Sequence, residues 1–194
     1  MVGESPSPQE LKPSAPNFAL VAAQIVKIER KCFPKHESLA DSVDYEIRKK
    51  NSGTLFIEVD GEVIGYLMFS FPSSLSVSIT KLAVKEGFRR RGHGETLLRA
   101  GIEMLRKRNV LRVSLHVDPK RIPALCLYQK IGFQIDTVVK GYYAPNRDAY
   151  RIVGAASLSN NLSSFHFWQS TRSGKSNRVT TGSVMRNQRL TVIE

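Results

Sequence analysis

Apolar residues recur at helical spacing in several stretches of this chain, and each stretch predicts a helix with one buried face. The first such helix should end before Pro34, which cannot continue a helix, and Ser38 can cap the second. The buried stripe of the first helix is expected to consist of Leu20, Ala23, Ile25, Val26 and Ile28. Helices are expected over residues 18–30, 39–49, 94–107 and 122–131.

Runs of β-branched and aromatic residues between these helices predict strands. Residues 54–60 and 62–71 meet at Asp60-Gly61, and an Asp-Gly pair supplies the positive φ angles that a two-residue hairpin turn requires. Further strands are expected over residues 74–84, 110–117, 132–139 and 148–153. The resulting order of elements predicts an α/β fold, in which a sheet with antiparallel and parallel parts lies between layers of helices.

Composition divides the 194 residues into one folded domain and two loose ends. Residues 1–16 are rich in Pro and Ser and are expected to form a disordered leader, whereas residues 17–153 carry the periodic pattern. Residues 154–194 are expected to form a flexible, basic tail rich in Ser, Thr and Asn, with a weakly docked aromatic group at Phe165, Phe167 and Trp168. The chain lacks an apolar run of membrane-spanning length, so no membrane partner is expected.

The net charge of +12 favours a polyanionic partner, because arginines are concentrated at residues 89–91 and basic residues at 106–108. A phosphorylated cofactor and nearby ribosomal RNA both fit this charge. Specific nucleic-acid binding is not expected, since no basic motif with interleaved aromatic residues is present. Cys32 and Cys126 lack a CxxC spacing and nearby histidines, so we expect two buried thiols with neither a disulfide nor a metal site.

The segment FRRRGHGETLL, residues 88–98, lies between a predicted strand and a predicted helix. Such a junction directs backbone N–H groups and the positive end of the helix dipole at one point, which predicts a phosphate-binding loop. The segment is not a dinucleotide-binding fingerprint, because Leu97 stands where the third glycine is required, and it lacks the Gly-Lys-Ser/Thr of a P-loop.

The pattern Arg89-x-x-Gly92-x-Gly94 resembles the pyrophosphate loop of the GNAT acyl-CoA N-acetyltransferase superfamily, and ALCLYQKIGF at residues 124–133 resembles a second motif of that family. The resemblance extends over residues 25–153. It implies the GNAT fold, with a central mixed sheet splayed between strands 4 and 5, and acetyl-CoA as the acetyl donor without a metal. The implied cofactor-binding residues are Leu82, Ala83, Val84, Arg89, Arg90, Arg91, Gly92, His93, Gly94, Glu95, Thr96 and Arg121.

Three flanking segments, CFP at 32–34, LHV at 115–117 and KGYYAPNRDAY at 140–150, are similar to protein Nα-acetyltransferase catalytic subunits and the bacterial ribosomal-protein alanine acetyltransferase. This similarity implies a peptide or protein N-terminus as acceptor, association with the ribosome or an auxiliary subunit, and a cytoplasmic location, with nuclear or organellar locations left open. The implied acceptor-binding residues are Phe33, Pro34, Lys35, Tyr142 and Tyr143. Each also has a simpler interpretation, as the end of a helix or as ordinary hairpin residues.

The resemblance also implies two catalytic residues, with His116 as a base acting through water and Tyr128 as a proton donor to the departing thiolate. Ser78 stands where similar enzymes have a second catalytic tyrosine, and Arg121 stands where the family often has a cofactor-contacting asparagine. An α-amine is roughly 10% neutral at pH 7, whereas a lysine is below about 0.1%, so a histidine base suits an N-terminal acceptor. A lysine or small-amine acetyltransferase and a non-catalytic acetyl-CoA-binding domain remain alternatives.

Overall fold

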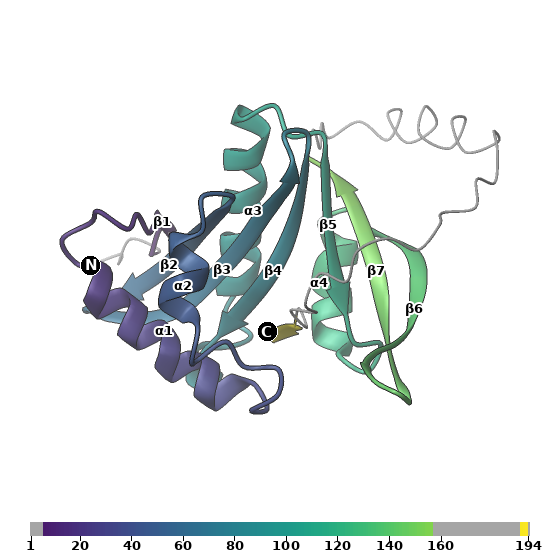
Figure 1. Cartoon of the computed structure of the whole chain (residues 1–194), viewed down its shortest axis with the longest axis horizontal. Helices are drawn as coiled ribbons and strands as arrows, with labels where there is room; N and C mark the ends of the chain where they lie inside the picture. Colours follow the sequence, from purple (N-terminus) through teal and green to yellow (C-terminus); the bar gives the residue numbers. More distant parts are fainter. Residues whose placement is uncertain (1–5, 157–190, 194) are drawn as a thin grey trace.

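The computed structural model describes residues 6–156 and 191–193, which form a mixed sheet with helices on both faces (Figure 1). The strand order is β1-β2-β3-β4-β5-β7-β6, and β8 pairs with β4 off this path. The helices are α1 (Phe18–Cys32), α2 (Val43–Arg48), α3 (His93–Lys107) and α4 (Ile122–Lys130). The strands are β1 (Gln9–Glu10), β2 (Ser52–Val59), β3 (Glu62–Ser73), β4 (Ser76–Val84), β5 (Arg112–Val117), β6 (Gln134–Ala144), β7 (Arg147–Ala155) and β8 (Thr191–Ile193).

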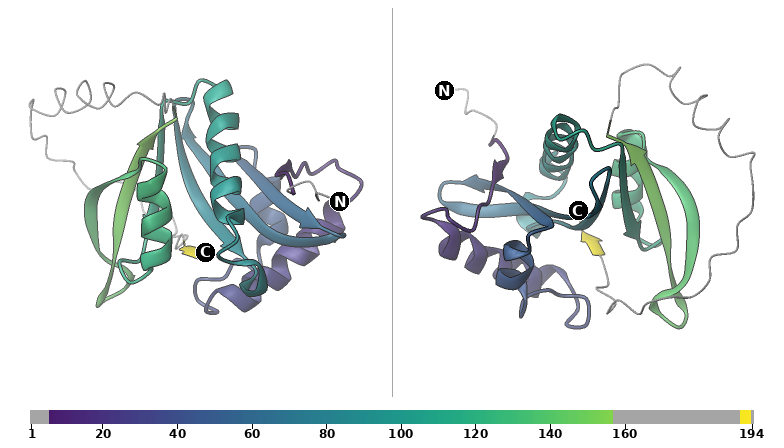
Figure 2. Two further views of the ribbon diagram at one scale, coloured as in Figure 1. Left: turned by 180° about the vertical axis from the view of Figure 1, so that it is seen from behind. Right: turned by 45° about the horizontal axis from the view of Figure 1, so that its top comes forward.

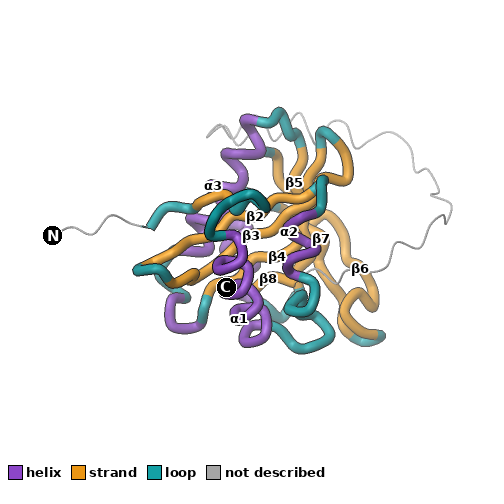
Figure 3. The backbone as a smooth tube through the Cα atoms, turned by 60° about the vertical axis from the view of Figure 1, so that its left-hand side comes forward, coloured by secondary structure: helices purple, strands orange, loops and turns teal. Residues whose placement is uncertain are grey.

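Three layers arise because each face of the sheet buries its own set of apolar side chains. Helices α1 and α2 cover one face (Figure 3), where Ile25 and Ile28 pack with Tyr66 and Met68. Helices α3 and α4 cover the other (Figure 2), where Leu97 and other apolar residues form the larger cluster. The predicted α/β sheet between layers of helices is therefore confirmed.

Two helices differ from their predictions, and a buried glutamate takes part in both differences. The inward stripe of α1 contains Val21, Ile25, Ile28 and the fully buried Glu29. Leu20 is 63% exposed and Ala23 is also exposed, so the predicted stripe was wrong at these two members. Helix α2 begins at Val43 instead of residue 39. The Glu29 carboxylate accepts a hydrogen bond from the Leu39 backbone N–H at 2.7 Å, which holds that segment in a turn before α2 begins.

Strands β4 and β5 diverge after a short parallel segment, as the resemblance implies. Residues 76–78 pair with residues 112–114, and this is the full extent of their pairing in the described chain. A bulge follows at once: Ile79 pairs with Phe69 and Lys81 pairs with Met68, so Thr80 is an extra residue. Beyond the bulge β4 keeps β3 on one side, while β8 pairs with its other edge in parallel, from Lys81 to Ala83.

The structure also describes parts of both predicted loose ends. Residues 9–10 pair with β2 and Leu11 is 4% exposed, so this portion of the leader is ordered against the sheet. Strand β7 extends to Ala155, two residues into the predicted tail. The predicted aromatic group at Phe165, Phe167 and Trp168 lies outside the described residues. Among the helices that the structure describes, none has the length and apolar character needed to cross a membrane.

Candidate active site

The turn from β4 into α3 brings the predicted phosphate-binding residues together. Gly92 stands at the N-terminus of α3 with φ 85°, and Arg90 has φ 62°, so two left-handed residues direct the backbone into the helix. No side chain among the described residues caps α3, whose first N–H groups therefore keep their capacity to bind an anion. Gly94 lies buried in the first turn, after His93.

The charged side chains of this loop have different partners. Arg89 donates from Nε to the Val84 carbonyl at 3.0 Å and from Nη2 to Cys32 Sγ at 3.3 Å, which fixes it against the end of β4. Arg90 and Arg91 are exposed. Glu95 pairs with Arg99 and Lys130, and its neutralised carboxylate leaves the helix N-terminus suitable for phosphate. Thr96 donates from Oγ1 to the Gly92 carbonyl at 3.1 Å.

The predicted cofactor strand, Leu82 to Val84, is buried and lies beyond the point where β5 leaves β4. Ser78 and Ser114 form the last pair before this divergence, so Ser78 stands at the fork. In the structure β8 pairs with residues 81–83, which include two of the cofactor candidates. Arg121 lies apart from the loop, because its guanidinium pairs with Glu37 after α1.

His116 lies on β5 with its imidazole stacked on Tyr142, at 4.6 Å between ring centroids and 13° between planes. Burial lowers the pKa of His116 below its usual 6.5, and the nearby Arg151 lowers it further. The imidazole is therefore neutral near pH 7, as a base must be. Its buried Nδ1 has no hydrogen-bond partner among the described residues.

Helix α4 carries the second catalytic candidate. Tyr128 is 1% exposed and meets the Phe133 ring edge-on at 5.9 Å, so its side chain is part of the core beside the diverging strands. Cys126 on the same helix is exposed and Cys32 is half-buried, so the prediction of two buried thiols is wrong for Cys126 and only partly met by Cys32. Periodicity failed there because α4 is a short helix whose apolar residues face several directions.

The predicted acceptor residues lie on two segments, the loop after α1 and strand β6. Phe33 and Tyr143 are 4% and 0% exposed, whereas Pro34 and Lys35 are exposed. The Tyr142 ring meets the Tyr143 ring edge-on, at 4.9 Å between centroids, and also stacks on His116. The candidate base is therefore in contact with a candidate acceptor-binding residue. Burial is the main cause of the raised pKa of Tyr143, which stays protonated at neutral pH.

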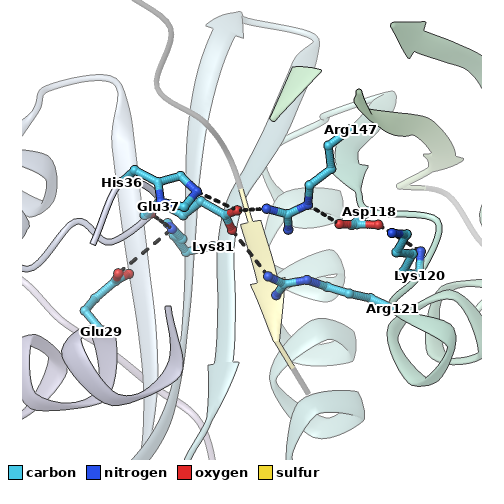
Figure 4. A network of polar contacts seen from close by, with 8 residues as sticks. All are labelled: Glu29, His36, Glu37, Lys81, Asp118, Lys120, Arg121 and Arg147. Carbon is cyan, nitrogen blue, oxygen red and sulfur yellow. Dashed lines mark hydrogen bonds and ion pairs between the residues drawn. The ribbon is translucent and has the colours of Figure 1, made fainter. Parts of the chain in front are cut away.

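A buried ionic network, which was not predicted from the sequence, lies between these segments (Figure 4). We call it the Glu37 network, and its five members are Glu37, Lys81, Asp118, Arg121 and Arg147. Glu37 has a fully buried carboxylate that pairs with Arg147 and, at 3.3 Å, with Arg121. Arg147 also donates to Asp118 at 2.6 Å. A lysine inside the apolar run ITKLAV, residues 79–84, was the one local sign of such a network.

The network contains a lysine and an aspartate with altered titration. Burial lowers the pKa of Lys81 from 10.5 to about 8, although Glu29 and Glu37 oppose this shift. Burial would raise the pKa of Asp118, but hydrogen bonds from the Lys120 N–H and from Arg147 outweigh it, so the pKa is lowered. No group of side chains suited to hold a metal ion occurs among the described residues.

Comparison with known proteins supports a common fold and chemistry. Residues 22–133 match the acetyltransferase (GNAT) family. A Sulfurisphaera tokodaii protein named N-alpha-acetyltransferase is 34% identical over 139 residues, covering 66% of this chain and 83% of that protein. The ribosomal-protein-S18-alanine N-acetyltransferase from Escherichia coli has a similar structure, with a TM-score of 0.69 at 18% identity over 80% of this chain and 96% of that one.

A structure with a ligand adds to this comparison. A GNAT family acetyltransferase from Elizabethkingia anophelis, solved with acetyl-CoA bound, has a TM-score of 0.62 at 16% identity, covering 78% of this chain and 99% of that one. At such identities the two solved structures show the shared fold alone.

Proposed function

This chain belongs to the acetyltransferase (GNAT) family, and on that premise we propose that it acetylates the α-amine of a peptide or protein N-terminus by direct attack on acetyl-CoA. Family membership makes the chain an N-acetyltransferase. The names of its relatives favour a peptide or protein acceptor, since they include an N-alpha-acetyltransferase and a ribosomal-protein alanine acetyltransferase. The contact of His116 with Tyr142 is the observation that carries the proposal.

The residues at the β4–α3 turn fit a pyrophosphate. The uncapped N-terminus of α3 and the left-handed Gly92 offer backbone N–H groups without a Cβ in the way. Acetyl-CoA, when bound there, supplies a thioester carbonyl. A backbone N–H of β4 among residues 82–84 would stabilise the negative charge that develops on the carbonyl oxygen.

The two catalytic candidates act on different protons. His116 takes a proton from the acceptor amine, directly or through one water, and its lowered pKa keeps it able to do so at pH 7. Tyr128 lies on α4 and donates a proton to the departing thiolate at the point where β4 and β5 diverge. A neutral histidine is sufficient for an α-amine, of which about 10% is neutral at pH 7, and much less suited to a lysine.

Acetyl transfer to a set of matched peptides tests this proposal. The set contains peptides with a free N-terminus that differ in their first residue, the same peptides with a blocked N-terminus and one internal lysine, and spermidine. We expect turnover on free N-termini and a loss of at least about a hundredfold in kcat/KM on the blocked peptides. Equal or higher activity on lysine or spermidine would overturn the proposed acceptor, while leaving the acetyltransferase assignment intact.

A further inference from the structure

The Glu37 network joins segments that are far apart in the sequence. Glu37 follows α1, Arg121 precedes α4, and Arg147 begins β7 at the end of the β6–β7 hairpin. The Glu37 carboxylate binds both guanidinium groups, and its backbone carbonyl accepts a hydrogen bond from Lys81 Nζ at 2.6 Å. One residue therefore connects the loop after α1 to β4, to α4 and to the β6–β7 hairpin (Figure 4).

Two cations of this network also lie against the two buried acceptor candidates. Lys81 Nζ is 3.9 Å from the centre of the Phe33 ring, and Arg147 Cζ is 4.8 Å from the centre of the Tyr143 ring. These are favourable cation–π distances. Phe33 and Tyr143 are therefore each in contact with a cation that also binds Glu37.

The bulge in β4 is what brings Lys81 to this side of the sheet. Val77 and Ile79 pack in the cluster beneath α3 and α4, so odd-numbered residues face that layer before the bulge. The extra residue Thr80 reverses the alternation, because side chains in a strand point to opposite faces with a period of two. Lys81 consequently faces α1, whereas Leu82 faces the layer of α3 and α4.

Charge balance makes Glu37 indispensable to this arrangement. The carboxylates of Glu29, Glu37 and Asp118 face the three cations Lys81, Arg121 and Arg147. Removal of the Glu37 charge leaves a positive excess among groups that are largely shielded from water, so the two guanidinium groups would repel one another. The loop after α1 and the β6–β7 hairpin would then separate, together with Phe33 and Tyr143.

We propose that Glu37 is a positioning residue that fixes the distance between Phe33 and Tyr143 and thereby determines how tightly the acceptor is bound. The inference rests on the proposed function, because it assigns these two aromatic residues to the acceptor pocket. Glu37 acts through Lys81 and Arg147 and takes no part in the acetyl transfer itself.

Steady-state kinetics of the full chain carrying Glu37→Gln test the inference, with Glu103→Gln as a matched control. Glu103 also pairs with an arginine, Arg106 at 2.8 Å, but on the exposed side of α3. We expect Glu37→Gln to raise the KM for an N-terminal peptide about tenfold, the effect of losing one hydrogen bond to a charged group. Its kcat and its KM for acetyl-CoA should stay within about threefold of wild type.

Hydrogen–deuterium exchange provides a second readout that needs no substrate. In Glu37→Gln, exchange should increase together in residues 33–40 and 141–147, and Glu103→Gln should show no increase in either segment. If the wild type acetylates no N-terminal peptide, the proposed function fails, and the exchange result still decides the role of Glu37.

Two results would overturn the inference: a folded Glu37→Gln protein with an unchanged peptide KM, or an equal loss in the peptide and acetyl-CoA parameters. Should Glu37→Gln fail to fold, Arg147→Gln serves instead. The Arg147 side chain is 29% exposed, so this variant leaves a less buried defect, and it should show the same selective increase in peptide KM.

Discussion

The donor side and the acceptor side of the candidate site are built in different ways. The proposed donor side is a continuous stretch, residues 82–96, whose backbone N–H groups and left-handed glycine would supply the binding groups. The proposed acceptor side gathers side chains from β4, from β7 and from the residue before α4 around one buried carboxylate in the loop after α1. A site made of backbone tolerates changes of side chain except at glycine, whereas a site held by buried charges is sensitive to the loss of any one of them.

His116 is the candidate base and contacts the acceptor side through Tyr142, so its removal should have the largest effect. We expect His116→Ala to lower kcat/KM at pH 7 by about a hundredfold to a thousandfold, the lower part of the usual range for a general base. The loss should shrink as the pH rises toward 9, because the acceptor α-amine, with a pKa near 8, is then already neutral. Because burial lowers the pKa of His116 below its usual 6.5, the imidazole is already neutral at pH 7, so the full effect should be seen there.

The measurement is kcat/KM against pH for wild type, His116→Ala and Tyr128→Phe on one N-terminal peptide. Tyr128→Phe removes a proton donor to the thiolate, so its loss of about tenfold to a hundredfold should not be recovered at high pH. A His116→Ala profile parallel to that of wild type would eliminate the base assignment.

Gly92→Val tests the backbone-built donor side. At φ 85° a β-branched residue is strained, yet a Cβ at this position meets no atom within 4 Å, so the fold should persist. We expect CoA affinity to fall about thirtyfold to a hundredfold, since the loop must alter the φ angle that directs its N–H groups. Gly61→Val in the β2–β3 turn is the control, because Gly61 has a similar φ of 76°, is equally unobstructed and lies outside the donor stretch. Calorimetric titration with CoA that gives the same affinity for both variants would exclude this loop as the pyrophosphate site.

The pH dependence of the unfolding free energy tests whether Lys81 is a buried charge of the proposed acceptor side. Its pKa is about 8 in the folded chain against 10.5 for an ordinary lysine. Between these values the unfolded chain binds more protons, so the free energy of unfolding should rise with pH by about 2 to 3 kcal/mol across this window. Lys81→Met should lack this rise, whereas the exposed Lys107→Met should retain it.

Urea unfolding of the three proteins at pH 7.5, 9 and 10 measures the difference. Since other groups titrate in the same range, the relevant quantity is the difference in unfolding free energy between wild type and Lys81→Met at each pH. A difference that stays constant with pH would show that Lys81 is charged throughout and is solvated better than its burial indicates.

The same contrast explains how much of the molecule could be predicted from its sequence. The Asp60-Gly61 hairpin and α3 were predicted because turn chemistry and helical periodicity are local properties. The residues of the predicted donor loop could be proposed for the same reason, since they occupy one continuous segment. The buried face of α1 was misplaced because Glu29, a charged residue, belongs to it.

The Glu37 network could not be predicted, because its closest ion pair joins residues 37 and 147. No spacing rule connects residues so far apart, and each member except Lys81, which interrupts an apolar run, looks like a solvated charge when taken alone. Even the direction of Lys81 depends on a one-residue bulge at Thr80, which nothing in the alternating run SVSIT reveals.

The smallest effect should come from β8, which pairs with the edge of β4 that the donor is proposed to use. Its pairing to residues 81–83 takes up backbone groups of Leu82 and Ala83, so β8 and acetyl-CoA would compete. Pairing of a three-residue strand contributes little free energy beyond the entropy lost in ordering it. Val192→Pro removes one backbone N–H and disfavours this pairing. The variant should therefore lower the KM for acetyl-CoA by only about twofold to threefold. The peptide KM should not change, because the Glu37 network lies on side chains that β8 pairing does not require.

Initial rates at varied acetyl-CoA and fixed saturating peptide measure this effect, with deletion of residues 157–194 as the limiting case. A higher KM for acetyl-CoA in both variants would mean that β8 supports the donor site and does not compete with it.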